Sequence, residues 1–491
     1  MAGHRLSSGI ALFAICATFF VAPASLASVD TYQVEIRPDL GQLEITACLH
    51  TAGLEMRAGH SRAAEFLISA VAADSDHKLS LIGNTLKPRL TDRCLRYRVD
   101  LQRAARSNPR YARVGTQAVA VETAKWLWLP RNQGATTKQI SFKLTPGMRV
   151  SVPWQPVSAS SRERIYTIPN SPASDDSVSV FGNFPQCTIE VAQARLRTAL
   201  VPGRFRGDVE SLTTWLATAA HNVGLSYGRF PNPNPQIVVI PGAKHLRDSG
   251  EPVPFGHVIR NGGEAVQFFV NQMRPAEDFV ADWTATHEFA HLMIPYVSAT
   301  EKWISEGLAS YYQNVLMARG GHYRADKAWR KIIEGFRRGE NSVPHLSLEN
   351  AMPLGGWDGI MKTYWGGAAI FLMADVELRR VSDGKQSLDT ILDALQKCCL
   401  PSSRTWHGKR LFEKLDALAG RPVFVPLYQR YRRDKQFPGY DELLESLGLA
   451  LGSNGIRMDD AAPLAAIRDR IMLPPVNNPL AYNVDCGDTV D

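Results

Sequence analysis

Two histidines and a glutamate within five residues carry the clearest chemistry of the sequence, in His287-Glu288-Phe289-Ala290-His291. Residues four positions apart lie one turn above the other on an α-helix, so both imidazoles can bind the same cation. Glu288 is rotated by about 100° from His287 and can flank that cation. The pattern H-E-x-x-H on a helix is typical of zinc held by two histidines beside a carboxylate base. We therefore predict a Zn²⁺ site at His287 and His291, with Glu288 as its base.

A catalytic zinc usually has three protein ligands and one position for water, so the motif requires another donor. Glu306, fifteen residues after His291, is the candidate. It belongs to the apolar-faced stretch Trp303–Tyr312, which is predicted to be a helix after a short loop containing Pro295. A hairpin of two helices would return Glu306 to the cation. The alternative is an exposed helical carboxylate, because most glutamates are exposed.

The elements around these residues follow from the apolar pattern. The helix that carries the histidines is expected to begin at Pro275 and to end before Pro295. Before Cys187 the pattern is one of short alternating runs such as Tyr32–Ile36, which indicates strands. Ala118–Val121 would be a strand buried on both faces, because it is apolar throughout.

Four segments are predicted in this α+β protein. Residues 1–27 form a signal peptide, and residues 28–188 form an antiparallel, β-sandwich-like domain. Residues 189–400 form a mixed catalytic domain, and residues 401–491 form a mostly helical segment with a Pro-rich tail.

The signal peptide is predicted from its three parts. His4 and Arg5 precede the apolar stretch Ile10–Val21, and Ser25-Leu26-Ala27 offers small residues for cleavage. The apolar stretch is shorter than the roughly 20 residues of a membrane helix, so no stable membrane insertion is expected after cleavage. An N-terminal core helix is the alternative. The predicted location is periplasmic or secreted, and the signal does not distinguish the two.

Six cysteines follow the signal segment, an even number that predicts disulfides in an exported protein. They are Cys48, Cys94, Cys187, Cys398, Cys399 and Cys486. Pairing of Cys48 with Cys94 is favoured, because both lie in the same strand-rich region. The adjacent Cys398 and Cys399 are expected to have a structural role, since no C-x-x-C spacing accompanies them.

The composition excludes other classes of protein. Hydrophobic residues make up 45% and charged residues 21% of the chain, so a folded protein is expected rather than a disordered one. The formal net charge is +7, but the basic residues are scattered along the chain. A nucleic-acid partner is therefore not expected. The sequence gives no indication of the oligomeric state.

The sequence resembles the gluzincin peptidases, in which a helix with H-E-x-x-H is followed by a second helix bearing a glutamate ligand. The context W-I-x-E-G-x-A-x-Y-Y around Glu306 is typical of them. Two further stretches, Thr363–Ala369 with the helix after it and Phe437–Leu449, are most similar to the glycyl aminopeptidase family. The resemblance covers about Val191 to Leu451.

This resemblance implies a thermolysin-like (gluzincin) catalytic domain with zinc held by His287, His291 and Glu306. It implies Glu288 as the base that activates the metal-bound water. Tyr364 would donate to the oxyanion formed when the peptide carbonyl is attacked. The alternative for Tyr364 is a half-buried helical aromatic.

Gluzincins commonly bind an extended peptide along a sheet edge, and the stretch Gly262–Val270 is the candidate edge strand. In this interpretation Gly263 and Glu264 bind substrate, and the Glu264 carboxylate holds the free ammonium group. A solvated turn glutamate is the alternative.

The predicted function is that of an exported zinc aminopeptidase acting on peptide substrates. Two alternatives stay open. One is a zinc endopeptidase with the same centre, and the other is a non-catalytic binding protein on a peptidase scaffold.

Overall fold

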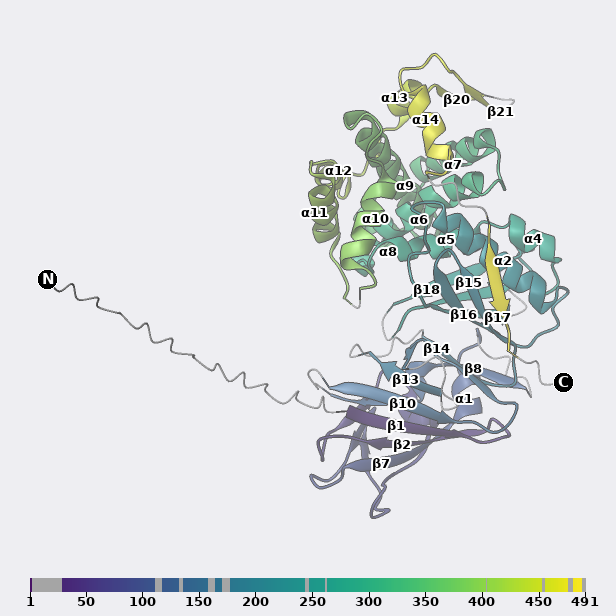
Figure 1. Cartoon of the computed structure of the whole chain (residues 1–491), viewed down its shortest axis with the longest axis vertical. Coiled ribbons are helices and arrows are strands. Elements are labelled where there is room, and N and C mark those ends of the chain that lie inside the picture. The colour runs from purple at the N-terminus through teal and green to yellow at the C-terminus, as the bar shows by residue number, and fades with distance from the viewer. Residues whose placement is uncertain are drawn as a thin grey trace.

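The computed structural model describes residues 1, 29–110, 117–131, 136–157, 164–169, 177–242, 247–260, 263–402, 404–452, 455–475 and 480–487. The predicted signal peptide lies outside the described residues, apart from Met1. Figure 1 shows a β-rich N-terminal part below a mixed part, with a layer of helices at the top. This order is the predicted α+β arrangement of a β domain followed by a catalytic domain rich in helices.

The described residues of the N-terminal part form three sheets. Their orders are β12-β13-β10-β1-β2-β7-β4, β5-β6-β3-β9 and β11-β14-β8. Buried and exposed residues alternate along β1, as in a sheet with one face on the core. The strands are β1 (Val29–Ile36), β2 (Gln42–Cys48), β3 (Met56–Ala58), β4 (Leu67–Ala72), β5 (Ser80–Ile82), β6 (Thr85–Lys87), β7 (Cys94–Asp100), β8 (Ala118–Glu122), β9 (Trp128–Pro130), β10 (Thr137–Lys143), β11 (Arg149–Ser151), β12 (Gln155–Pro156), β13 (Arg164–Ile168) and β14 (Val178–Gly182), with helix α1 (Leu101–Arg106) after β7.

Three details of this part bear on the sequence predictions. The largest sheet is antiparallel except between β1 and β10, which are parallel. The roughly one hundred residues between these two strands leave room for the crossover connection that parallel pairing requires. The strand predicted at Ala118–Val121 is β8, and all five of its residues are buried. Cys48 and Cys94 are partners across β2 and β7 and form a disulfide, which confirms that pairing.

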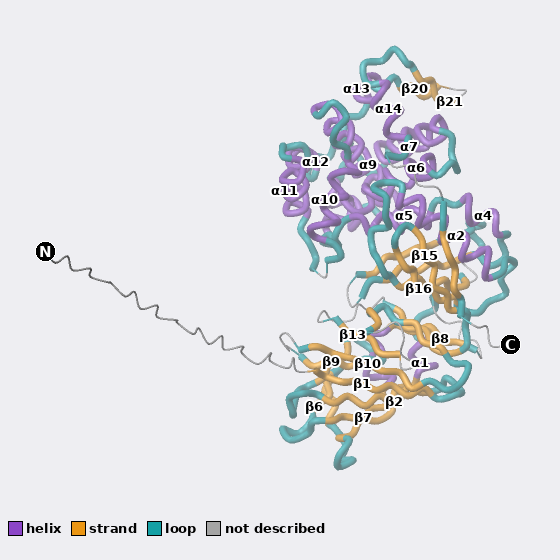
Figure 2. The backbone as a smooth tube through the Cα atoms, viewed as in Figure 1, coloured by secondary structure: helices purple, strands orange, loops and turns teal. Residues whose placement is uncertain are grey.

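A six-stranded sheet joins the two parts of the molecule (Figure 2). Its order is β18-β19-β17-β16-β15-β22, with β16, β17 and β19 parallel. One face packs in the large core with the helices, and the other packs against β8 and β14 of the N-terminal part. The strands are β15 (Gln186–Val191), β16 (Ala194–Leu200), β17 (Gln236–Pro241), β18 (Phe255–Ile259), β19 (Ala265–Val270) and β22 (Tyr482–Asp485).

The ends of this sheet come from distant parts of the chain. β15 crosses the predicted boundary at residue 188. β22, from the end of the chain, pairs with β15, and a disulfide joins Cys187 to Cys486. The C-terminal segment therefore returns to the sheet of the predicted catalytic domain.

The edge of the sheet lies elsewhere than the sequence predicts. The stretch predicted as the edge contains β19, which lies inside the sheet between β17 and β18. All six residues of β19 are buried, as expected for a strand covered on both faces. The edge strand beside β19 is β18, where only Ile259 is fully buried.

Helices cover the outer side of the six-stranded sheet and form the top of the molecule. They are α2 (Val209–Gly224), α4 (Ala276–Ala281), α5 (Thr284–Ala290), α6 (Lys302–Arg319), α7 (Ala325–Glu340), α8 (Leu348–Leu354), α9 (Gly356–Val381), α10 (Leu388–Cys399), α11 (Gly408–Ala419), α12 (Phe424–Tyr431), α13 (Asp441–Ser446) and α14 (Ala465–Met472), with the hairpin β20 (Leu449–Gly452) and β21 (Gly455–Met458). The adjacent Cys398 and Cys399 at the end of α10 form a disulfide with each other.

The single helix predicted from Pro275 is divided into α4 and α5. Asp282 has an extended backbone between them, and its carboxylate accepts a hydrogen bond from the Thr284 backbone N–H at 2.7 Å. A short acidic side chain that binds a nearby backbone N–H competes with the continuing helix. Burial raises the pKa of Asp282 to about 6, against the hydrogen bonds from Thr284, which lower it.

This raised pKa predicts a pH-dependent stability. The folded state binds the Asp282 proton more tightly than the unfolded state, so stability falls as the pH rises from about 4 to about 6. Asp282→Asn keeps the acceptor for Thr284 and removes the buried charge. It should stabilise the protein by about 2 kcal/mol above pH 7 and by little at pH 4. Denaturant titrations at several pH values would measure this difference. The exposed Asp74→Asn should show none, and an unchanged pH slope in Asp282→Asn would contradict the assignment.

A buried network of charges fixes α6 against α9 and α10. Arg319 of α6 donates to both oxygens of Asp389 on α10, at 2.9 and 3.0 Å. Arg379 of α9 donates to Asp375 at 3.0 Å and to Asp389 at 3.3 Å, and the hydroxyl of Tyr311 donates to Asp375 at 2.8 Å. Because every charge is paired, the network stabilises one relative position of the three helices.

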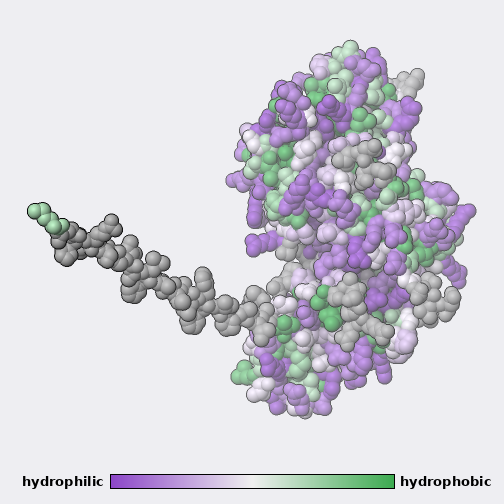
Figure 3. Space-filling model, viewed as in Figure 1, coloured by the Kyte–Doolittle hydropathy of each residue, from purple (hydrophilic) through white to green (hydrophobic). Residues whose placement is uncertain are grey.

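The described helices include none that combines the length and apolar character needed to cross a membrane. On the face in Figure 3, hydrophilic residues are spread over both parts of the chain, and apolar residues lie among them.

Candidate metal centre

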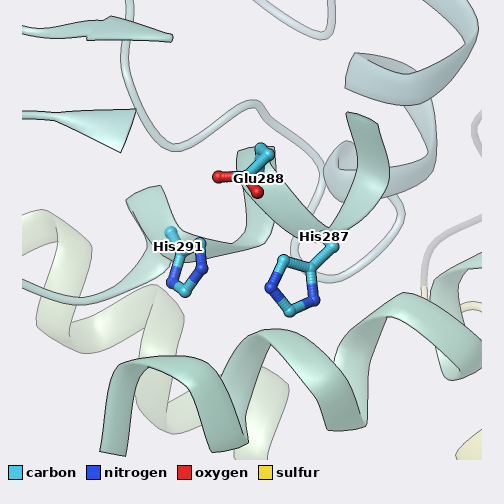
Figure 4. A group of neighbouring side chains, drawn as sticks. All are labelled: His287, Glu288 and His291. Carbon is cyan, nitrogen blue, oxygen red and sulfur yellow. The ribbon is translucent and has the colours of Figure 1, made fainter. Parts of the chain in front are cut away.

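His287, Glu288 and His291 form a candidate metal site, in which one ligand atom from each lies within 4.8 Å of the others. His287 and Glu288 belong to α5, and His291 follows it at the start of a 3₁₀ turn, His291–Met293, with its backbone still helical. The helical spacing predicted from the motif is therefore kept. Figure 4 shows the two imidazoles beside each other, with the Glu288 carboxylate above them.

Glu306 comes to these histidines from the first turns of α6, because α5 and α6 pack as a hairpin. Its Oε2 lies 3.4 Å from Nε2 of His287 and 3.4 Å from Nε2 of His291. The side chain is only 15% exposed, so it is not the exposed carboxylate of the alternative interpretation. Burial would raise the pKa of Glu306, but the imidazoles outweigh it and hold the pKa well below its usual range.

The donor atoms of these three residues fit a zinc ion. The buried Oε2 of Glu306 makes no hydrogen bond, which is costly for a carboxylate unless a cation compensates it. Two imidazole nitrogens and one carboxylate oxygen are the donor set of a catalytic zinc site that keeps a position open.

Gln313 orients one of these donors and was missed by the sequence analysis. Nδ1 of His287 lies 2.7 Å from its side-chain oxygen. When Nδ1–H donates to this oxygen, the lone pair of Nε2 faces the site. Metal-binding histidines are usually oriented by a hydrogen bond of this kind. The signal was present in the sequence, because Gln313 lies seven residues after Glu306 and therefore on the same face of α6.

Glu288 lies against the edge strand of the sheet. A Cβ added to Gly256 of β18 would lie 2.3 Å from Cγ of Glu288, so only glycine permits this approach. Burial raises the pKa of Glu288, Glu306 raises it further, and the two histidines oppose the shift. A raised pKa favours the uptake of a proton, which a general base requires.

This contact gives a prediction for Gly256→Ala. The new methyl group should displace the Glu288 side chain while the zinc donors keep their positions. A misplacement of about 1 Å costs on the order of 100-fold in rate. We expect such a loss in kcat/KM for peptide hydrolysis, with the zinc content unchanged. Gly439→Ala is the control, because nothing lies within 4 Å of its added Cβ. Parental activity in Gly256→Ala would show that Glu288 does not depend on this contact.

Tyr364 is brought to the site by α9. Its ring stacks on that of His287, with centroids 5.8 Å apart and planes 16° from parallel. The helices α6 and α9 approach closely here, as Gly307 shows. A Cβ added to Gly307 would lie only 2.4 Å from the Gly367 backbone. Burial, followed by the carboxylates of Glu306 and Glu288, raises the pKa of Tyr364 well above 10. Its hydroxyl is therefore a proton-bearing donor at neutral pH.

Gly263 and Glu264 lie before β19, outside the group formed by the histidines and Glu288. Gly263 has φ +129°, and its added Cβ would lie 2.4 Å from the carbonyl oxygen of Pro153 in the N-terminal part. Glu264 lines a small cavity together with Arg260. Burial raises the pKa of Glu264, and the positive charge of Arg260 opposes this shift.

Comparisons with known proteins support the fold. No protein-family model and no curated protein matches the chain. An aminopeptidase N family protein from Idiomarina loihiensis is 16% identical, with a TM-score of 0.63 over 86% of this chain and 79% of that chain. A mutant M1 zinc metallopeptidase from Deinococcus radiodurans, bound to a Tyr-Ser-Ala substrate, is 12% identical, with a TM-score of 0.53 over 84% of this chain and 95% of that chain.

The chain therefore has the fold of M1 aminopeptidase N family zinc metallopeptidases, with a candidate H-E-x-x-H metal site in it. At this identity the likeness concerns the fold alone. The narrower resemblance to glycyl aminopeptidases stays a prediction.

Proposed function

We propose that the chain is an exported zinc-dependent aminopeptidase, with zinc held by His287, His291 and Glu306. The observation that carries the proposal is the Glu306 oxygen, which lies 3.4 Å from both imidazole nitrogens and makes no hydrogen bond. A lone H-E-x-x-H pair lacks this third donor. The likeness to M1 metallopeptidases supports the proposal through the fold.

The chemistry divides among the residues of the site. When bound, zinc supplies a water of lowered pKa and polarises the substrate carbonyl. Glu288 takes the proton of the attacking water and later passes it to the leaving amine, for which its raised pKa is suited. Tyr364 keeps its proton and donates a hydrogen bond to the oxyanion.

Export rests on the predicted signal peptide at residues 1–27. The three disulfides among the described residues support it, because disulfides persist mainly in oxidising compartments. The proposed location is the periplasm or the external medium.

Recognition of a free amino terminus is assigned to Glu264, with Gly263 beside it. Burial raises the pKa of the Glu264 carboxylate, and the positive charge of Arg260 acts to lower it. Arg260 would therefore compete with a substrate ammonium group for this carboxylate, which favours the alternative of an endopeptidase. Paired peptides with free and acetylated amino termini distinguish these functions. An aminopeptidase cleaves only the free peptides, and Glu264→Gln should raise their KM. Equal cleavage of both forms would favour the endopeptidase.

Metal analysis with an amino-terminal peptide library tests the proposal as a whole. Protein purified without chelator should contain about one zinc per chain. A chelator should abolish peptide hydrolysis, and added zinc should restore it. Absence of zinc, together with absence of cleavage, would favour the non-catalytic binding protein.

A further inference from the structure

Arg260 joins the edge strand to the end of the helix that carries the histidines. It directly follows β18, and its guanidinium donates to the carbonyl oxygen of Ile294 at 2.6 Å and to that of His291. Carbonyls at the end of a helix have no partner within the helix and carry partial negative charge. The planar guanidinium, with donors in a fixed fork, can bind two such oxygens at once. This contact therefore fixes the backbone of His291 itself.

The surroundings of Arg260 strengthen this contact. The apolar residues Leu292, Ile294 and Leu400 line the same small cavity as Arg260. Burial lowers the pKa of Arg260 to about 10, and Glu264 opposes this shift. The guanidinium therefore stays charged at neutral pH, in a place where water competes little for the two carbonyl oxygens.

The strand β18 thus holds α5 and the turn after it at two points. Gly256 is the surface against which Glu288 packs, and Arg260, four residues later, holds the carbonyl of His291. The contact at Gly256 positions the proposed base, Glu288. The contact at Arg260 positions a proposed zinc ligand, His291.

We propose that Arg260 is a positioning residue, which holds the backbone of His291 to the edge strand and thereby slows the release of zinc. The inference rests on the proposed zinc site. It adds a residue that is not among the proposed ligands and that the motif does not contain.

The test measures zinc release without any peptidase assay. The zinc-loaded full chain is mixed with excess chelator, and a colorimetric zinc indicator follows the rate. Loss of a partner that orients a ligand typically weakens metal binding 10- to 100-fold. We expect Arg260→Met to release zinc about 10 to 100 times faster than the parent, with Arg260→Lys between them. Arg195→Met, an exposed arginine in the same sheet, is the control and should behave like the parent.

A second readout separates positioning from general destabilisation. In the cobalt-loaded protein, the visible absorption bands report the geometry around the metal. They should shift in Arg260→Lys and stay unchanged in Arg195→Met. If Arg260→Met does not fold, Arg260→Lys carries the test alone. Parental release rates and parental cobalt spectra in the folded Arg260 variants would overturn the inference. A parent that binds no zinc would instead contradict the proposed function.

Discussion

Glu288→Gln is expected to abolish peptide hydrolysis while the fold and the zinc content stay at parental values. The amide has nearly the same shape as the carboxylate and keeps its place against Gly256. It cannot take a proton from water, and general base catalysis typically contributes 10²- to 10⁴-fold. We expect kcat/KM to fall by at least about 1,000-fold, because the same group also returns the proton to the leaving amine.

Three measurements on the same preparation check this expectation. They are kcat/KM on a peptide with a free amino terminus, zinc per chain, and the circular dichroism spectrum. Glu277→Gln, an exposed glutamate on α4, is the matched control and should retain parental activity. If Glu288→Gln hydrolyses peptides at the parental rate, the base has been assigned to the wrong residue.

The convergence of the proposed zinc donors could be predicted from the sequence because their positions depend on local geometry. The spacing of His287 and His291 is fixed by one helical turn, and a hairpin to the next helix brings Glu306 to them. The pairing of Cys48 with Cys94 could also be predicted from the sequence, because both cysteines lie in one strand-rich region.

The edge of the sheet could not be predicted in the same way. Strand order depends on which strands pair in three dimensions. Both β18 and β19 contain apolar residues, so their composition does not show which one lies at the edge. The complete burial of β19 indicates an interior strand only when its neighbours are known. For the same reason, the contacts of Gly256 and Arg260 with the histidine-bearing helix have no signature in the sequence.

The break between α4 and α5 has a different cause. The apolar pattern favoured one helix, but the local hydrogen bond from Thr284 to Asp282 ends the first and begins the second.

Glu306→Ala is expected to lose zinc, because removal of this carboxylate leaves only two imidazoles to bind it. The effect on affinity should exceed the roughly 10- to 100-fold loss typical for residues that only orient a ligand. Added zinc should therefore raise the melting temperature of the metal-free parent but not that of the variant, since a ligand stabilises only the state that binds it. Ser305→Ala, one residue earlier on α6, is the matched control and should bind zinc like the parent. Stoichiometric zinc in Glu306→Ala after gel filtration against a weak chelator would remove Glu306 from the ligand set.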